Sequence, residues 1–327
     1  MKPSSNSSSS SSSKPSGLLL IDKPSGPTSH DVVARVRRAL QTRSVGHAGT
    51  LDPMASGVLV VMVGSCTKLS SYLTLEDKVY RARILLGYAT DTLDAEGSIT
   101  DSATVPAALL SILAHIEKGH FEQNDRQALH HALVMERNRT LQVPPSYSAI
   151  KRDGVASYQR ARRGEQLELP ARDVRVHRLD LVGATMDPPS VIVEVHVSKG
   201  YYVRALARDL GRSLELPSHL MELRRLRSGA FGLEDTITLD ADARAMNDAM
   251  LSVEQTARRC LPVATLTRQG ACRALRGQAL GDDDFAHPPI ERVSAWFSEE
   301  GRLVAIGDRS RGRPTVCRAF LHIDEMC

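Results

Sequence analysis

The sequence predicts an α+β fold, because patterns typical of strands and patterns typical of amphipathic helices both occur along the chain. An unbroken apolar run at 58–63 indicates a buried strand, and apolar residues alternate with polar ones at 78–87 and 191–198. Apolar residues at helical spacing over 28–40 and 203–214 indicate two amphipathic helices. At 327 residues the chain is long enough for one large domain and a small companion.

The first ordered element is predicted at 17–21, as a short buried strand that ends in a turn rich in proline and glycine. Thr28 is placed to cap the helix that follows, with Asp31 in its first turn. Alternation of polar and apolar residues along the strand expected at 78–87 places Tyr80 on its apolar face. Residues 106–142 are expected to be mostly helical and polar.

Composition changes mark the expected domain limits. Residues 1–16 are rich in serine and lack an apolar core, which predicts a disordered tail and neither a secretory signal nor a folded segment. Asp235 to Ala257 is helix-like and polar, and short strand and turn patterns resume beyond Pro262. We therefore expect a large domain at 17–255 and a small one at 256–327.

Composition also limits the class of protein. No apolar stretch approaches the roughly 20 residues that span a bilayer, so a membrane protein is not expected. The five cysteines are scattered and form no C-x-x-C pair, which predicts reduced thiols in a cytoplasmic protein.

Lys and Arg number 42 against 38 Asp and Glu, and the net charge of +4 only mildly favours a polyanionic partner. Clustered arginines either converge to neutralise phosphates or lie on solvated helix faces. The clusters are Arg35, Arg37, Arg38 and Arg43, then Arg160, Arg162 and Arg163, then Arg224, Arg225 and Arg227.

Four histidines fall within a helical insertion expected at about 107–138. Their spacings match neither H-E-x-x-H nor a C2H2 pattern, so a solvated insertion is favoured over a metal site. They are His115, His120, His130 and His131.

The most informative segment is 46–53, where two glycines and a proline constrain the backbone around His47 and Asp52. Rigid loops of this kind position catalytic groups. An aspartate before a proline is equally typical of a simple turn. These residues alone leave both interpretations open.

Residues 46–59, GHAGTLDPMASGVL, resemble the signature of the TruB-type tRNA pseudouridine synthases. Further segments between about 17 and 235 resemble motifs of that family in the same order, which is hard to explain by chance. They are LIDKP at 20–24, KVYR at 78–81, TDTLDAEG at 90–97, VPPSYSAIK at 143–151, and 198–204 together with LRR at 223–225.

The resemblance implies a mixed, largely antiparallel sheet with flanking helices, the pseudouridine synthase fold, over 17–255. It implies a small β-rich, PUA-like RNA-binding domain at 256–327. The expected reaction is the isomerisation of uridine to pseudouridine at position 55, in the TΨC loop of tRNA, by base detachment, rotation and reattachment. The enzyme would need neither a metal nor an organic cofactor and would act as a cytoplasmic monomer.

Carried onto this sequence, the family pattern assigns the catalytic carboxylate to Asp52, which either attacks covalently or abstracts a proton at the sugar. Arg204 would pair with this carboxylate and hold it ionised. Tyr80 would stack on the extruded uracil, because the base must leave its stack before its glycosidic bond can be attacked.

The same pattern assigns four supporting residues. Tyr202 would lie against the base from the other side of the pocket, and Leu223 would add an apolar floor. His47 would fill the gap that the flipped base leaves in the T-loop. Lys23 would be a scaffold residue that tightens the Asp52 loop.

Two other classes of function fit parts of the sequence. A non-catalytic RNA-binding or tRNA-folding protein would keep the cleft and lose the reaction, but the intact Asp52 and Arg204 argue against this. An unrelated aspartate-dependent hydrolase would need a second acid, a metal cluster or a nucleophile elbow, and the sequence contains no G-x-S-x-G.

Overall fold

The computed structural model describes residues 15–120, 127–147, 151–152, 155–156, 169–310 and 312–325. The predicted tail therefore lies outside the described residues, except for Pro15 and Ser16. The Ser16 hydroxyl accepts a hydrogen bond from the backbone N–H of Ser65 at 2.9 Å. Within the described ranges, none of the helices has the length and apolar character that crossing a membrane requires.

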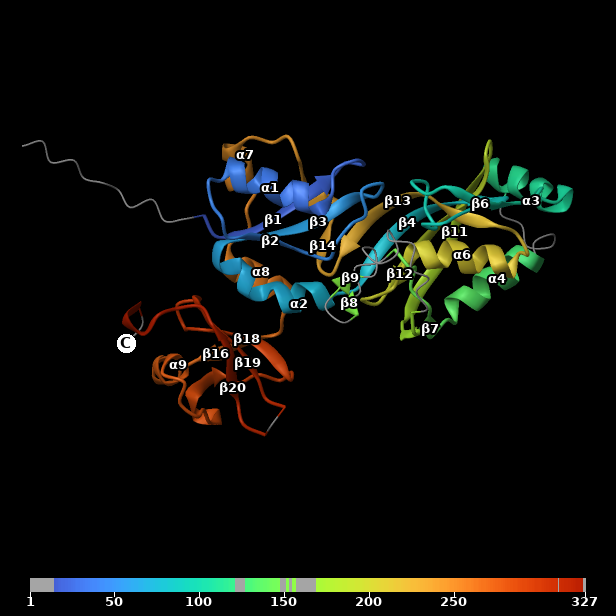
Figure 1. Ribbon diagram of the computed structural model, residues 1–327. Coiled ribbons are helices and arrows are strands. Elements are labelled where there is room, and N and C mark those ends of the chain that lie inside the picture. Colours follow the sequence, from blue (N-terminus) through green and yellow to red (C-terminus); the bar gives the residue numbers. More distant parts are fainter. Residues whose placement is uncertain are drawn as a thin grey trace, which may run out of the picture.

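Nine strands form the main sheet (Figure 1). They are β1 (Gly17–Lys23), β2 (Val45–Ala48), β3 (Ser56–Val63), β4 (Lys78–Leu86), β11 (Val176–Met186), β12 (Pro189–Val197), β13 (Ser218–Ser228), β14 (Phe231–Gly232) and β15 (Ile237–Thr238). Their order is β11-β12-β4-β13-β3-β1-β15, with β14 beside β13 and β2 beside β3. Among the described residues of this sheet, only β1–β15 and β3–β13 pair in parallel, which confirms the predicted mixed, largely antiparallel sheet.

Strand β3 shows why its sequence is an unbroken apolar run. Leu59, Val61 and Val63 enter one hydrophobic core, whereas Val58 and Val60 enter a second core on the opposite face of the sheet. Successive side chains of a strand point to opposite faces, so a strand covered on both faces must be apolar throughout.

Helices cover both faces of the sheet. The larger core is closed by α1 (Ser29–Ala39), α3 (Ala107–Glu117), α4 (Gln127–Arg137), α6 (Val203–Ser213) and α7 (Ala243–Asp248). The second core is closed by α2 (Ser70–Leu75) and α8 (Val253–Cys260). The predicted cap of α1 is confirmed, because the backbone N–H of Asp31 donates to the Thr28 hydroxyl at 3.1 Å and the Thr28 N–H donates to the Asp31 carboxylate at 2.8 Å.

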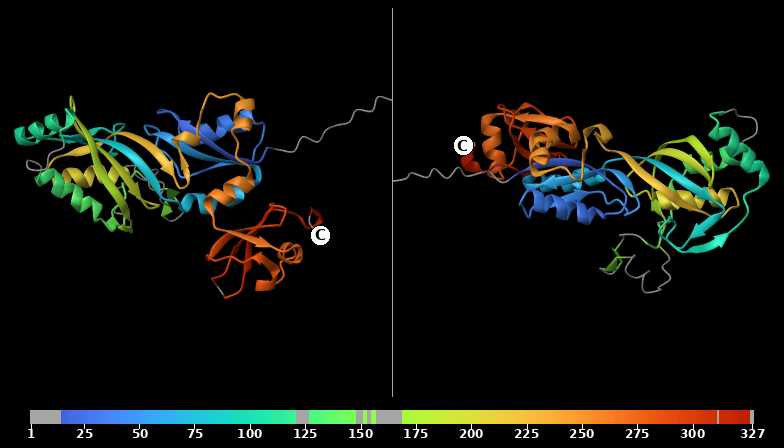
Figure 2. Two further views of the ribbon diagram at one scale, coloured as in Figure 1. Left: turned by 180° about the vertical axis from the view of Figure 1, so that it is seen from behind. Right: turned by 90° about the horizontal axis from the view of Figure 1, so that it is seen from above.

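The C-terminal residues form a separate β-rich unit, as predicted. Five strands pair in the order β17 (Phe285–His287), β16 (Val263–Leu266), β18 (Val293–Phe297), β19 (Leu303–Asp308) and β20 (Thr315–Ala319), next to α9 (Arg268–Leu275). A small core surrounds the fully buried Trp296. The unit lies beside α2 and α8 (Figures 1 and 2), and its Phe297 and Leu303 join the second core.

The described residues also form three two-stranded sheets. They pair β5 (Tyr88–Thr90) with β6 (Ile99–Ser102), β7 (Leu141–Gln142) with β10 (Arg172–Asp173), and β8 (Lys151–Arg152) with β9 (Val155–Ala156).

Two sequence predictions need correction. The segment 235–257 is not continuously helical, because Asp242 and Ser252 each cap the start of a new short helix by accepting a backbone N–H bond. The prediction that all cysteines are reduced is wrong for Cys272, which is disulfide-bonded, whereas Cys66, Cys260 and Cys317 are free. The predicted insertion holds α3 and α4, and its four histidines are exposed.

Candidate active site

The loop that carries Asp52 connects β2 to β3 and is fixed at its centre by α1. The backbone N–H of Leu51 donates to the hydroxyl of Ser29 at 2.9 Å, and this hydroxyl donates to the Leu51 carbonyl at 3.1 Å. Ser29 is buried in the first turn of α1. A buried pair of reciprocal hydrogen bonds holds the loop in one conformation next to Asp52.

Lys23 ties the same loop to the turn after β1. Its fully buried ammonium donates to the carbonyls of Pro24 and Pro27 at 2.9 Å and to the carbonyl of Pro53 at 3.2 Å. Burial lowers the pKa of Lys23 to about 8, and the nearby Asp52 carboxylate opposes this shift. Lys23 therefore joins the turn after β1 to the loop that carries Asp52.

Arg225 holds the loop from the side of β13. Its fully buried guanidinium donates to the carbonyl of Val58 at 2.7 Å and to the carbonyl of Gly49 at 3.1 Å. Gly57 lets the backbones of β3 and β13 lie close together, because a Cβ at this position would lie 2.2 Å from the backbone carbonyl oxygen of Arg225. The interpretation of Arg225 as a phosphate contact is wrong, since a fully buried side chain cannot reach RNA.

The other arginines of the sequence clusters lie in different settings. Arg224 pairs with Asp22 at 2.7 Å, and Arg227 pairs with Glu234 at 2.8 Å. Those of the first cluster, at 35, 37, 38 and 43, are exposed. Those of the second, at 160, 162 and 163, lie outside the described residues.

The guanidinium of Arg204 faces the carboxylate of Asp52 with two nitrogens. Nε lies 3.0 Å from Oδ2, and Nη2 donates to Oδ1 at 3.3 Å. The Arg204 side chain is 9% exposed and the Asp52 side chain 33% exposed. The carboxylate thus keeps partial contact with solvent while its partner is enclosed. Two parallel contacts between a guanidinium and a carboxylate give the pair a fixed geometry.

Three further groups fix Arg204. It donates to the carbonyl of Thr92 at 3.2 Å and to the carbonyl of Tyr147 at 2.9 Å, and its Nη1 lies 3.4 Å from the Asp94 carboxylate. Asp94 is buried and accepts a hydrogen bond from the Thr92 hydroxyl at 2.6 Å. The segments at 90–97 and 143–147 therefore converge on one guanidinium.

The surroundings of Asp52 raise the pKa of its carboxyl above the ordinary value. Burial is the largest cause, Arg204 opposes it, and the negative charge of Asp94 adds to the rise. This rise differs from the expectation that Arg204 alone sets the pKa of Asp52, since a neighbouring guanidinium by itself would lower it. The guanidinium offsets only part of the cost of removing the carboxylate from water.

Tyr80 and Leu223 lie on neighbouring central strands. Tyr80 is half-buried on β4, where its register partner on β13 is Arg225, which in turn pairs with Gly57 at the start of β3. Leu223 is buried on β13, opposite Ala82. Tyr80 thus lies two strands away from the end of the Asp52 loop.

Tyr202 directly precedes α6 and lies two residues before Arg204. Its backbone N–H donates to the side chain of Gln142 at 2.8 Å, and its carbonyl accepts from the same amide at 3.2 Å. This pair of hydrogen bonds fixes the start of α6, and with it the helix turn that carries Arg204.

His47 lies on β2 and is half-buried. Its ring meets that of His30 edge to face, with centroids 5.4 Å apart, and its Nδ1 has no hydrogen-bond partner among the described residues. Burial lowers the pKa of His47, and His30 and Arg225 lower it further. The environment favours a neutral ring over a charged one.

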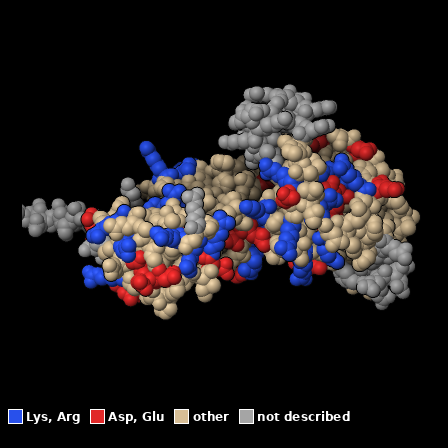
Figure 3. All heavy atoms as spheres, turned by 90° about the horizontal axis from the view of Figure 1, so that it is seen from below, with Lys and Arg blue, Asp and Glu red and all other residues tan. Residues whose placement is uncertain are grey.

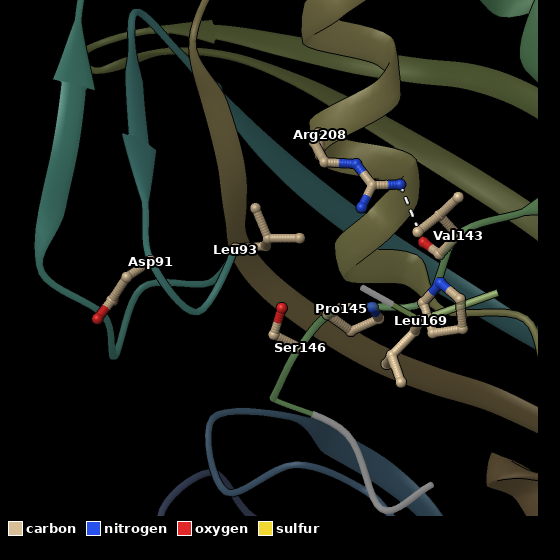
Figure 4. Close-up of a pocket in the computed structure, with 8 residues that line it drawn as sticks. Asp91, Leu93, Val143, Pro145, Ser146, Leu169 and Arg208 are labelled. Atoms are coloured by element: carbon tan, nitrogen blue, oxygen red, sulfur yellow. Dashed lines mark hydrogen bonds between the residues drawn. The ribbon is translucent and has the colours of Figure 1, made fainter. Parts of the chain in front are cut away.

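A cavity of about 490 Å³ lies beside the Arg204 anchors (Figure 4). It is lined by residues next to Thr92 and Tyr147, among them Leu93 and Ser146, and by Arg208, which donates to the carbonyl of Val143 at 3.0 Å. None of the residues predicted from the sequence for the site lines it. The cavity therefore lies beside the two segments that hold Arg204.

Comparison with known proteins identifies relatives of this chain. Residues 37–203 match the family model described as TruB family pseudouridylate synthase (N terminal domain). The tRNA pseudouridine synthase B of Thermobifida fusca is 39% identical over 302 residues, which cover 90% of this chain and 95% of that protein. That of Mycolicibacterium paratuberculosis is 42% identical over 298 residues, covering 88% and 94%.

The fold is also similar to that of a solved structure. The crystal structure of a Cbf5-Nop10-Gar1 complex contains a chain that matches with a TM-score of 0.69 and 24% sequence identity, covering 94% of this chain and 86% of that one. The likeness supports the fold, and the sequence matches identify the family. The chain belongs to the TruB family of pseudouridylate synthases.

Proposed function

We propose that the protein converts uridine to pseudouridine in tRNA, at position 55 of the TΨC loop. The observation that carries this proposal is the two-point pairing of Asp52 with Arg204, at a carboxylate that is one-third exposed. The relatives that match nine-tenths of the chain are named tRNA pseudouridine synthase B, which supports tRNA as the substrate.

The reaction rearranges bonds without net gain or loss of atoms. The bond between C1′ and N1 breaks, the uracil turns, and a bond forms between C1′ and C5. The proton on C5 is lost and N1 gains one. Asp52 either attacks the nucleotide covalently or abstracts a proton at the sugar, and either role requires its ionised form.

Arg204 supports that form of Asp52 and fixes its direction. Its other contacts, to Thr92, Tyr147 and Asp94, prevent the guanidinium from following the substrate. The carboxylate therefore stays in one place while the base moves. A preorganised charge pair of this kind requires little rearrangement during the reaction.

The remaining roles concern the RNA. Tyr80 stacks on the extruded uracil, Tyr202 lies against its other side, and Leu223 closes the pocket with an apolar surface. His47, whose neutral form is favoured, fills the gap that the base leaves in the T-loop. Lys23 keeps the catalytic loop closed on its scaffold.

The same proposal covers the RNA-binding surface. Figure 3 shows lysine and arginine side chains gathered along the middle of one face, with acidic side chains among them. Residues 17–255 form the catalytic domain, and residues 256–327 form a PUA-like domain that adds RNA contacts. The cytoplasmic location and the monomeric state stay predictions.

One assay tests reaction and position together. Purified protein is incubated with an unmodified tRNA transcript, and pseudouridine is mapped by carbodiimide-based primer extension. A single stop at position 55 is expected. A stop at another uridine overturns the position alone, and the absence of any stop overturns the proposed function.

A further inference from the structure

A second cluster of polar side chains lies at the edge of the main sheet, outside the site built around Asp52. It consists of Asp77, His177 and His196, whose ligand-type atoms all lie within 4.8 Å of one another. Nε2 of His177 is 3.0 Å from Oδ2 of Asp77, and Nε2 of His196 is 3.9 Å from the same oxygen. The mechanism proposed above uses none of the three.

A β-bulge brings the two histidines together. In the β11–β12 ladder Val176 pairs with Val197 and Arg178 pairs with His196, so the register shifts at His177. Side chains alternate between faces in a regular strand, and His177 would then point away from the face of its neighbour Arg178 and of His196. The bulge turns it back, and the two imidazole rings lie 4.7 Å apart.

We propose that Asp77, His177 and His196 bind one divalent transition-metal ion, with Zn²⁺ as its representative, through one carboxylate oxygen and two imidazole nitrogens. Ligand atoms about 2.0–2.2 Å from an ion lie at most about 4.4 Å from each other. Both measured distances to Asp77 satisfy this limit. Small side-chain rotations close the remaining separation within the cluster.

The chemistry of the donors selects the class of ion. Two imidazoles with one carboxylate suit Zn²⁺ and related first-row ions, whereas Mg²⁺ and Ca²⁺ prefer sites made entirely of oxygen. The side chains of His177, His196 and Asp77 are 26%, 41% and 44% exposed, so an ion enters from solvent and keeps water in its open position.

Bound metal would join three parts of the sheet. His177 lies on the edge strand β11, His196 on β12, and Asp77 directly before β4 (Figure 1). Strand β4 carries Tyr80 three residues after Asp77. The ion would therefore fix the edge strand against the strand that carries the proposed stacking residue.

The test uses the full chain without RNA, so its outcome is independent of the proposed function. The protein is stripped with a chelator, dialysed against buffered Zn²⁺ and measured by titration calorimetry and elemental analysis. One bound ion per chain is expected. His196→Gln and Asp77→Asn should each weaken binding by at least tenfold, because loss of a ligand costs no less than loss of a supporting contact.

The matched control removes two exposed histidines elsewhere, in His130→Gln/His131→Gln, and should bind as the unaltered chain does. Substitution with Co²⁺ should give no thiolate charge-transfer band, which separates this cluster from the cysteines. Thermal unfolding in the presence of chelator shows whether each variant folds. If His196→Gln does not fold, zinc binding by the isosteric Asp77→Asn tests the proposal. Absence of stoichiometric binding, retention by Asp77→Asn, loss in the control or a thiolate band each overturns the proposal.

Discussion

The guanidinium of Arg225 lies fully buried behind the Asp52 loop and donates to the carbonyl of Gly49, 3.1 Å away. The same side chain donates to the carbonyl of Val58 at 2.7 Å, so one residue of β13 spans both ends of the loop. Because Asp52 lies between these two ends, a fully buried side chain helps to hold the loop that carries it.

Arg225→Met should lower the free energy of unfolding by about 2 kcal/mol, because two buried carbonyls lose their hydrogen bonds. It should also slow turnover, since the loop is released at both ends. Urea unfolding measures the first effect, and the tRNA assay the second. Arg224→Met is the matched control, as its half-exposed pair with Asp22 contributes about 0–1 kcal/mol. Equal stability losses in the two variants would contradict this role.

Asp52→Asn should abolish conversion of uridine while leaving affinity for a T-loop RNA within about tenfold, because contacts to phosphate remain. The amide keeps the size of the carboxylate and can still accept from Arg204, so the fold is retained. Turnover is measured by pseudouridine mapping and affinity by filter binding. Substantial turnover by this variant would remove Asp52 from the mechanism.

The sequence predicted the fold where one physical requirement dominates a segment. The residues of β3 are apolar on both faces, which predicted a buried strand. Helix α1 has a capping residue and one apolar face, which predicted an amphipathic helix. β13 was not predicted, because Glu222, Arg224 and Arg225 give it the look of a charged surface segment. Strand β13 lies in the middle of the sheet because it pairs with β3 and β4, which are distant from it in sequence.

The site shows the same division. Only the family resemblance linked Asp52 with Arg204, since local patterns carry no information on a contact between distant residues. Asp94 was missed, although its segment was recognised, because its contact with Arg204 joins residues that are distant in sequence. An aspartate two residues after a threonine was the available local signal, and the structure joins the two side chains by the Thr92–Asp94 hydrogen bond.

Binding to RNA should weaken with salt in proportion to the number of phosphates contacted. The exposed Arg35 and Arg38 on α1 are the members of the first cluster that we expect to contribute. Replacing each with Gln should reduce the slope of log K against log salt by about one. Arg244→Gln, on α7, is the control. A slope unchanged by both α1 variants would show that α1 does not bind RNA.

The pKa of Asp52 predicts where activity is lost in acid. Since burial raises it, the acid limb of kcat/KM should lie above the ordinary aspartate value of about 3.9, and activity should fall as the pH drops through the raised pKa. Asp94 contributes to the rise, so Asp94→Asn should lower the pKa of Asp52 and move the limb to lower pH.

The pH profile separates this electrostatic effect from a loss of structure. An Asn at 94 keeps an oxygen for the Thr92 hydroxyl but removes the charge near Arg204, so turnover at the plateau should fall while the limb shifts down. Asp101→Asn removes an exposed carboxylate from β6 and should leave both unchanged. A limb that stays in place, or moves up, in Asp94→Asn would mean that the charge of Asp94 does not act on Asp52, and that Asp94 only positions Arg204.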